Sequence, residues 1–382
     1  MKSISRRRFV GMLAGVPFLR VGLAPVSATT ERSSLERSKV EAVELILRKL
    51  VDSGAVPAVS YSIGNRSETL AEGAFGLRVV EPRAPMETRT HCPLASVSKQ
   101  FVSAGAYLLQ RKGMLSLDEP LSKYLPDYVH AHEMTLSQVL TMRSGIPAED
   151  EKCEAPVDGK IDEASLLANL NKQKLDFEPG HYFAYSNCAY NLAGVVLALV
   201  SKMSYDRFIE ESFFQPLGMT SSYVLGSREE ANFAQGYARE AKGWKTEPAT
   251  RADKVFASGN LVSTPGNMQL WNRSLLNGTV LSRETLQKMF TVPTAAGPAH
   301  THYASGWFVE PSGVIWHAGT LLGYGTNNML VPATGYAITL LSNTPQNDHW
   351  KPADVALEMY NAASLGPKLP PLLKRVRTTA PH

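Results

Sequence analysis

The chain has 382 residues, of which 44% are hydrophobic and 19% are charged. This length and composition allow a substantial buried core, which excludes disorder as the default and fits one large domain or two closely associated ones. The formal net charge of +4 comes from the N-terminus: residues 1–28 hold five basic and no acidic residues, and the rest carries 34 Lys and Arg against 35 Asp and Glu. We therefore expect no nucleic-acid-binding surface and no polybasic membrane patch.

Residues 1–28 have the order of regions found in an export signal. Residues 5–10 (Ser-Arg-Arg-Arg-Phe-Val) look like a twin-arginine motif, residues 10–19 are apolar, and Val26-Ser27-Ala28 offers small residues for cleavage. An uncleaved anchor is the alternative, but the apolar run is far shorter than the ~20 residues that span a membrane. We expect a periplasmic or secreted protein, exported by the twin-arginine machinery, with no stable membrane span in the mature chain.

The hydrophobic pattern predicts strands at both ends of the chain and helices between them. Ser33 and Glu36 predict a capping box for a helix that ends near Gly54. Strands are predicted over residues 59–63 and about 70–80, and a helix after Ser96 runs to about Lys112. Residues 115–277 are mostly helical in pattern, and strands return at 306–309, 314–316, 328–331 and 336–341.

These elements predict an α+β fold: an antiparallel β-sheet flanked by helices, with an inserted, mainly α-helical region. We expect a domain over residues 29–365, with a sheet body from about 33–95 and 290–362, a helical insertion over about 96–289, and a flexible tail over 366–382. A site would then lie between the sheet and the helical part.

The first candidate element for chemistry is Ser96-Val97-Ser98-Lys99. Side chains three residues apart share a face of a helix, so Lys99 would lie beside Ser96. Free N–H groups at a helix N-terminus favour an alkoxide or oxyanion, and a lysine in a dry environment can lose its proton and act as a base. The alternative is a serine N-cap followed by a solvated lysine, and this pair alone does not decide between them.

The second element is Tyr185-Ser186-Asn187, which precedes an apolar helix. The Tyr185 phenol can relay protons between the nucleophile, the leaving group and water. The Asn187 amide supplies both a donor and an acceptor, so it can hold Lys99 and a substrate carbonyl. The alternative is an Asn helix cap beside a packed tyrosine.

The third element is His317-Ala318-Gly319, which follows the strand predicted over 314–316. Gly319 removes any side-chain obstruction where the backbone approaches a ligand. The N–H of Thr320 can pair with the N–H of Ser96 to bind an oxyanion. Taken alone, a single histidine on a strand is more often structural.

The order Ser-x-x-Lys, Tyr-x-Asn, His-x-Gly, with first members 89 and 132 residues apart, resembles the serine β-lactamase and penicillin-binding superfamily. It is most similar to the branch of class C β-lactamases, DD-carboxypeptidases, D-aminopeptidases and related esterases. The resemblance spans about residues 38–345 and includes four flanking segments: residues 134–147, Phe177-Glu-Pro-Gly180, Ala257-Ser-Gly-Asn-Leu261 and Tyr303-Ala-Ser-Gly-Trp307.

This resemblance implies a β-lactamase/transpeptidase-like fold and a role for each motif residue. Ser96 would be the acylated nucleophile, Lys99 its activator, and Tyr185 the proton relay that also serves deacylation. Asn187 would orient lysine and substrate, His317 and Gly319 would line the strand edge, and the Ser96 and Thr320 N–H groups would form the oxyanion hole. The chemistry uses no metal and no cofactor, and we interpret the pairs His130/His132 and His300/His302 as loop histidines.

The chain departs from the superfamily where a Lys-Thr-Gly strand commonly binds a substrate carboxylate, because His317 and Ala318 stand in place of the lysine and threonine. Losing the ammonium and the hydroxyl would weaken carboxylate recognition by ~2–4 kcal/mol. We therefore expect a serine hydrolase acting through an acyl-enzyme on an ester or amide: an esterase, a D-aminopeptidase or a DD-carboxypeptidase-like enzyme. The alternatives are a true class C-type β-lactamase and a non-catalytic protein that binds peptidoglycan peptides on the same scaffold.

The three cysteines, Cys92, Cys153 and Cys188, are too few for a disulfide framework. One bridge is possible in an oxidising compartment. Because twin-arginine substrates usually fold before export, we expect free thiols.

Overall fold

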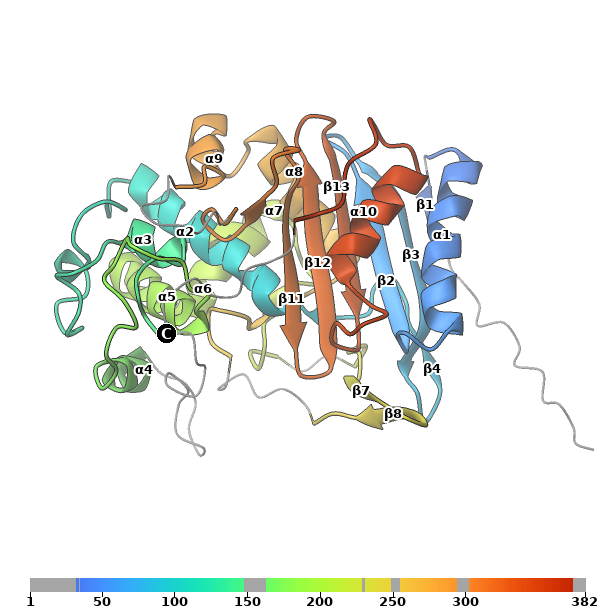
Figure 1. Ribbon diagram of the computed structural model, residues 1–382, viewed down its shortest axis with the longest axis horizontal. Coiled ribbons are helices and arrows are strands. Elements are labelled where there is room, and N and C mark those ends of the chain that lie inside the picture. The colour runs from blue at the N-terminus through green and yellow to red at the C-terminus, as the bar shows by residue number, and fades with distance from the viewer. Residues whose placement is uncertain are drawn as a thin grey trace, which may run out of the picture.

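The computed structural model describes residues 32–33, 35–147, 163–228, 231–248, 255–293 and 302–373. The predicted export signal over residues 1–28, Cys153, His300 and the end of the predicted tail lie outside these ranges. Figure 1 shows the strands of the large sheet at one side of the molecule and most of the helices at the other.

The body of the protein is an antiparallel sheet whose strand order is β1-β3-β2-β13-β12-β11-β10, with β4 paired to β3. The central pairing joins Ile63 of β2 to Ile338 of β13, so the two ends of the chain share one sheet. The strands of this sheet are β1 (Arg32–Ser33), β2 (Ala58–Gly64), β3 (Thr69–Val79), β4 (Ala84–Pro85), β10 (Phe308–Val309), β11 (Ile315–Leu321), β12 (Tyr324–Val331) and β13 (Tyr336–Ser342).

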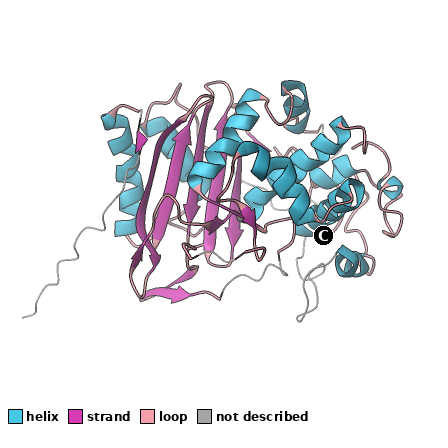
Figure 2. Ribbon diagram, turned by 180° about the vertical axis from the view of Figure 1, so that it is seen from behind, coloured by secondary structure: helices cyan, strands magenta, loops and turns pink. Residues whose placement is uncertain are grey.

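Helices cover both faces of this sheet. Helices α1 (Arg37–Asp52) and α10 (Pro352–Ala362) pack together on one face, and α8 (Pro265–Asn277) packs on β2 and β13 from the other. Figure 2, drawn from behind, shows the face that α8 covers. The alternation that predicted the strand over 59–63 therefore separates two buried faces: Tyr61 lies in the core beneath α1, and Ser62 donates to the Pro265 carbonyl of α8 at 2.8 Å.

The remaining helices form the inserted region. Helices α2 and α5 pack against each other, and the first eleven residues of α2 are all buried, as expected of a helix at the centre of a core. Helices and turns here are η1 (Ala95–Ser98), α2 (Lys99–Arg111), η2 (Leu121–Lys123), α3 (Leu136–Leu140), α4 (Glu163–Leu170), α5 (Asn187–Ser201), α6 (Tyr205–Ile209), η4 (Glu210–Phe214), α7 (Gln215–Leu217) and α9 (Arg283–Met289).

The region predicted as mostly helical also contains short strands. Strands β5 (Cys92–Pro93), β9 (Leu261–Ser263) and β6 (Tyr223–Val224) form a small sheet beside the entrance to η1, and β7 (Tyr237–Glu240) pairs with β8 (Gly243–Thr246). Two or three residues are too few to produce a detectable alternation, which is why the sequence pattern did not reveal β6 and β9.

The fold prediction is confirmed: a large antiparallel sheet is flanked by helices and carries a mainly helical insertion. The predicted capping box is wrong. Helix α1 has Glu36 as its N-cap without a side-chain cap bond, because Ser33 pairs with Ala71 in the β1–β3 ladder and cannot reach the helix. The domain boundaries stay predictions, although the start of the predicted tail is held in place, since the Leu373 N–H donates to Glu310.

The cysteine prediction is wrong for one position. Cys188 is disulfide-bonded, whereas Cys92 is free and buried. Burial raises the pKa of the Cys92 thiol to about 12.

Among the described residues, no single helix is both long and apolar enough to cross a membrane. Only α5 together with the segment Tyr205–Leu217, bent by 79°, meets the length and composition criteria as a pair.

Candidate active site

Ser96 lies in a strained turn that the small β9 sheet holds in place. It belongs to the 3-10 turn η1, directly before α2, and its side chain is partly exposed. The preceding Ala95 has a φ of 49°, a left-handed conformation that costs a residue with a Cβ about 1–3 kcal/mol. A backbone bond from Leu94 N to Leu261 O (2.7 Å) and a bond from Leu261 N to the side-chain oxygen Ser98 Oγ (3.1 Å) tie the turn to β9.

Lys99 is the first residue of α2, and its side chain is completely buried. Its Nζ lies 3.1 Å from Ser96 Oγ, 2.6 Å from Asn187 Oδ1 and 2.8 Å from the carbonyl oxygen of Ser258. The prediction that the Lys99 side chain lies beside that of Ser96, three residues earlier, is therefore confirmed. The two side chains are brought together by a 3-10 turn that leads into the helix. The lysine nitrogen joins the serine hydroxyl to two other segments of the chain.

Asn187 begins helix α5, and a capping serine sets its position. Ser186 is the N-cap: its hydroxyl accepts from the Ala189 N–H at 3.0 Å and donates to the Pro147 carbonyl at 2.8 Å. One turn along the same helix, Asn191 Oδ1 accepts from the N–H of Ser258 at 2.9 Å. Helix α5 therefore supplies one acceptor to Lys99 directly and positions the second through Ser258.

Sequence reasoning did not identify Asn191 and Ser258 as parts of this arrangement. Asn191 follows Asn187 by four residues, so it lies on the same helix face, and that spacing was the available signal. Ser258 lies in the segment Ala257–Leu261 that the resemblance includes, but nothing in the sequence indicated that its backbone carbonyl would meet Lys99, which is 159 residues away.

Tyr185 is partly buried beside the lysine. Its ring centroid lies 5.0 Å from Lys99 Nζ, and its ring packs against those of Tyr303 and His317 at 6.1 Å each. The structure thus brings Ser96, Lys99, Tyr185 and Asn187 together, which is the grouping that the sequence predicted.

His317 lies within β11, whereas the sequence prediction placed it after a strand. Its side chain is only 1% exposed. Nδ1 lies 2.7 Å from the carbonyl oxygen of Ala318, and Nε2 lies 3.2 Å from the hydroxyl of Tyr303. Both ring nitrogens therefore bond within the protein.

Gly319 lets β11 approach the Ser96 turn closely. A Cβ on Gly319 would come within 2.4 Å of both Leu94 O and Thr326 Oγ1, and within 2.9 Å of Ala95 Cβ. Thr320 follows it on the strand, opposite Gly325 of β12, and is exposed. In the described part of the chain, β10 pairs only with Ile315 and Trp316, so the outer edge of β11 has no strand partner from His317 onward.

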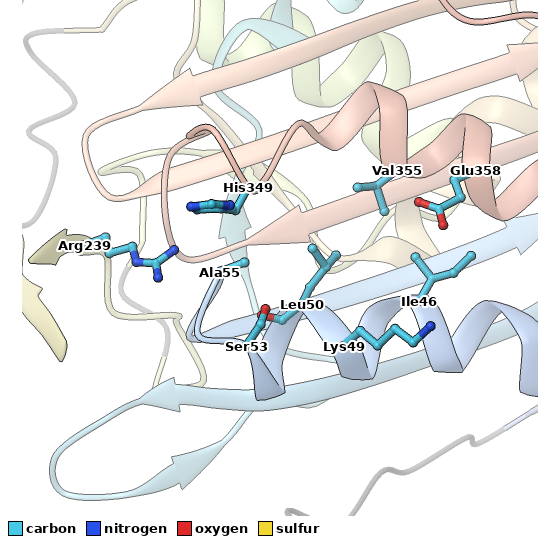
Figure 3. Close-up of a pocket in the computed structure, with 9 residues that line it drawn as sticks. All are labelled: Ile46, Lys49, Leu50, Ser53, Ala55, Arg239, His349, Val355 and Glu358. Atoms are coloured by element: carbon cyan, nitrogen blue, oxygen red, sulfur yellow. The ribbon is translucent and has the colours of Figure 1, made fainter. Parts of the chain in front are cut away.

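A cavity of about 470 Å³ lies elsewhere, at the α1–α10 face of the sheet (Figure 3). None of the predicted site residues lines it. Its walls are formed by Ile46, Lys49, Leu50, Ser53, Ala55, Arg239, His349, Val355 and Glu358.

His130, one of the histidines interpreted as lying in loops, has local protein partners. His130 bonds to Glu133 through Nδ1 at 2.7 Å and to the Gln173 carbonyl through Nε2 at 3.0 Å. Within the residues that the structure describes, no group of three or more His, Cys, Asp or Glu side chains is arranged to hold a metal ion.

A family model and several known proteins are similar to most of this chain. The family model described as Beta-lactamase matches residues 43–358. "Protein flp" of Staphylococcus aureus (strain MRSA252) is 25% identical over 321 residues, which cover 81% of this chain and 64% of that protein. The chain thus spans less than two thirds of that relative's length. "Putative penicillin-binding protein PbpX" of Bacillus subtilis (strain 168) is 24% identical over 333 residues, covering 85% of this chain and 82% of that protein.

Among solved structures, the D-amino acid amidase from Ochrobactrum anthropi SV3, complexed with L-phenylalanine, superposes with a TM-score of 0.73. The two chains are 23% identical, and the match covers 86% of this chain and 98% of the amidase. This likeness concerns the fold.

Proposed function

The chain belongs to the beta-lactamase family, and from this premise we propose that it is an exported serine hydrolase that cleaves an ester or amide through an acyl-enzyme on Ser96. The observation that carries the proposal is the position of Lys99 Nζ, which is buried and lies within 3.1 Å of Ser96 Oγ, Asn187 Oδ1 and Ser258 O. A buried lysine held by uncharged oxygens next to a partly exposed serine hydroxyl suits nucleophile activation better than it suits a structural ion pair.

In the proposed acylation, Ser96 Oγ attacks the substrate carbonyl carbon while the neutral Lys99 amine takes the hydroxyl proton. The carbonyl oxygen becomes an oxyanion, which the N–H groups of Ser96 and Thr320 stabilise. The bond to the leaving group then breaks, and the alcohol or amine departs with a proton relayed through Tyr185. Deacylation repeats these steps with water as the nucleophile: water gives up a proton to the same groups, the acyl–Ser96 ester bond breaks, and the serine regains its hydrogen.

The surroundings of His317 favour a substrate without a carboxylate next to the scissile bond. Both ring nitrogens bond to protein atoms, and Ala318 offers no hydroxyl. A carboxylate at this strand edge would lack the charge-assisted bonds that make such recognition strong. We therefore propose an esterase or D-amino-acid amidase-like activity, with DD-carboxypeptidase-like turnover next and efficient β-lactam hydrolysis last.

Export through the twin-arginine route remains part of the proposal. The disulfide at Cys188 supports a final location in an oxidising compartment, because such bonds are rare in the reducing cytosol. The test is cell fractionation of the full chain against a variant in which Arg6, Arg7 and Arg8 are all replaced by Lys. Equal amounts of the two proteins outside the cytoplasm would contradict this route.

The activity test is covalent labelling of the purified protein with a fluorophosphonate, followed by intact mass and peptide mapping. We expect one adduct on Ser96, none in Ser96→Ala, and an adduct still located on Ser96 in Ser98→Ala, because the Ser98 hydroxyl bonds to Leu261 N and is not the nucleophile. Turnover of a p-nitrophenyl ester, a D-Ala-D-Ala peptide and nitrocefin then ranks the substrates. No label and no turnover would leave the peptidoglycan-peptide-binding alternative, and efficient nitrocefin hydrolysis would refute the argument from His317 and Ala318.

A further inference from the structure

We propose that Tyr303 is a positioning residue of this site, whose phenol holds the His317 imidazole and whose ring supports the Tyr185 ring. The inference rests on the proposed function, because it assigns a role in the same reaction. No step of the acyl-transfer mechanism above uses Tyr303.

Tyr303 is buried at the point where the chain enters β10. Its side chain is 1% exposed, and it forms an isolated antiparallel bridge with Phe308. The following residue is held in a tight turn, since Ala304 N donates to the Trp307 carbonyl at 2.8 Å. The Tyr303 backbone is therefore anchored independently of its side chain.

The hydrogen-bond partners of His317 define which nitrogen carries the proton. Nδ1 faces the carbonyl oxygen of Ala318 at 2.7 Å, and a carbonyl can only accept, so Nδ1 carries hydrogen. In the neutral ring Nε2 is then an acceptor, and the Tyr303 hydroxyl donates to it at 3.2 Å. Because Tyr190 donates its own hydrogen to the Leu140 carbonyl at 2.6 Å, it can only accept from Tyr303, so the Tyr190 oxygen and His317 Nε2 compete for the one hydroxyl hydrogen of Tyr303.

The rings of Tyr303, His317 and Tyr185 contact one another in a group of three. Tyr303 meets Tyr185 at 6.1 Å with an interplanar angle of 81°, and meets His317 at 5.7 Å and 79°. His317 and Tyr185 close the group at 6.1 Å and 49°. Edge-to-face packing of this kind favours one relative orientation of the rings. If the Tyr303 phenol fixes the His317 ring, it also fixes a surface against which the Tyr185 ring rests.

The expected consequence is a loss of turnover with little change in apparent substrate affinity. Tyr303 packs against the proposed proton relay and its neighbour, and because its side chain is only 1% exposed, we do not expect it to contact the substrate. Misplacement of a relay by a fraction of an ångström slows the chemical step. We expect Tyr303→Phe, which keeps the ring and removes only the hydroxyl, to lower kcat about tenfold while KM stays within about twofold.

The experiment is a double-mutant cycle with Tyr303→Phe, His317→Leu and the double variant, assayed on the best ester or amide substrate. If the phenol acts through the imidazole, Tyr303→Phe has no further effect on kcat in the His317→Leu background. The matched control is Tyr107→Phe: this buried tyrosine bonds to Ser305 Oγ at 3.4 Å, in the same segment as Tyr303, and we expect its kcat to equal that of the wild type.

Additive effects in the cycle, or wild-type kcat in a folded Tyr303→Phe variant, would overturn the inference. A second measurement does not depend on the variants folding: ¹⁵N spectra of histidine-labelled wild type should show His317 as the Nδ1–H tautomer, and an Nε2–H tautomer would contradict the assignment. Wild-type protein that neither labels at Ser96 nor turns over substrate would refute the proposed function together with this inference. An active wild type with an unchanged Tyr303→Phe variant refutes the inference alone.

Discussion

Replacing Gly319 by Ala is expected to separate strand β11 from the Ser96 turn. The added Cβ would lie 2.4 Å from both Leu94 O and Thr326 Oγ1, and 2.9 Å from Ala95 Cβ. Carbon–carbon contacts are comfortable only near ~3.5–4.0 Å, so the strand must move away by roughly 1 Å. Because Leu94 O is a backbone atom two residues from Ser96, the turn cannot yield without moving the nucleophile itself.

This displacement sets the expected size of the effect. Overpacking of this kind costs about 1–3 kcal/mol of folding free energy. A misplacement of ~1 Å at a reacting centre costs about 100-fold in rate, so we expect kcat/KM and the rate of Ser96 labelling to fall together by that factor. Removing the Thr326 Oγ1 contact by Thr326→Ala should not restore activity, because the clash with Leu94 O remains.

The assay measures fluorophosphonate labelling rates and ester kcat/KM well below the melting temperature, with urea unfolding to report stability. Gly313→Ala is the matched control: Gly313 has a φ of 81° and no atom within 4 Å of an added Cβ. It should lose stability through backbone strain alone and keep its labelling rate. If folded Gly319→Ala keeps at least half of the wild-type labelling rate, the close approach of β11 is not part of the site.

Three further outcomes are expected. Lys99→Met should lower the rate of Ser96 labelling at least 1,000-fold, because an apolar side chain of similar shape removes the proposed base. Circular dichroism should show that this variant stays folded. Labelling at the wild-type rate would exclude Lys99 as the base. Asn191→Leu leaves the Ser258 N–H without its acceptor. We therefore expect the free energy of unfolding in urea to fall by about 1–3 kcal/mol and the labelling of Ser96 to slow. An unchanged free energy of unfolding would show that this bond does not hold the Ser258 segment in place. Burial raises the pKa of Cys92 to about 12, so the folded protein should resist iodoacetamide at Cys92 at pH 9 and react once unfolded in urea. The direction of the pH dependence follows from the rise in the Cys92 pKa from 9.0 in the unfolded chain to about 12 in the folded protein. The contribution of Cys92 to stability is complete below pH 9 and is lost as the pH rises toward 12.

The sequence was informative where the physical signal is local. Apolar and polar residues alternate over 59–63, and this pattern correctly predicted a strand, because side chains on a strand alternate between two faces. The apolar runs near the C-terminus also correctly predicted strands. The pair Ser96 and Lys99 was detectable because a single turn brings residues three apart together. The same local reasoning failed at Ser33, where pairing with a strand 38 residues away prevailed over a helix cap.

Contacts between distant segments were decided by the tertiary structure. The third acceptor of Lys99 is a backbone carbonyl 159 residues away, and no side-chain pattern encodes which carbonyl a folded chain will present. The ring contacts of Tyr303 have the same origin, since they depend on how β10, β11 and the loop before α5 meet.

By itself, then, the sequence determined the fold class and the order of the three motifs, because periodicity and short spacings are properties of neighbouring residues. Only the tertiary structure buried His317, turned both of its nitrogens toward the protein, and brought Gly319 against the Ser96 turn. Burial and the choice of hydrogen-bond partner depend on every element that packs around a residue. For His317 these include the loop before α5, which carries Tyr185, the segment before β10, which carries Tyr303, and β10 itself.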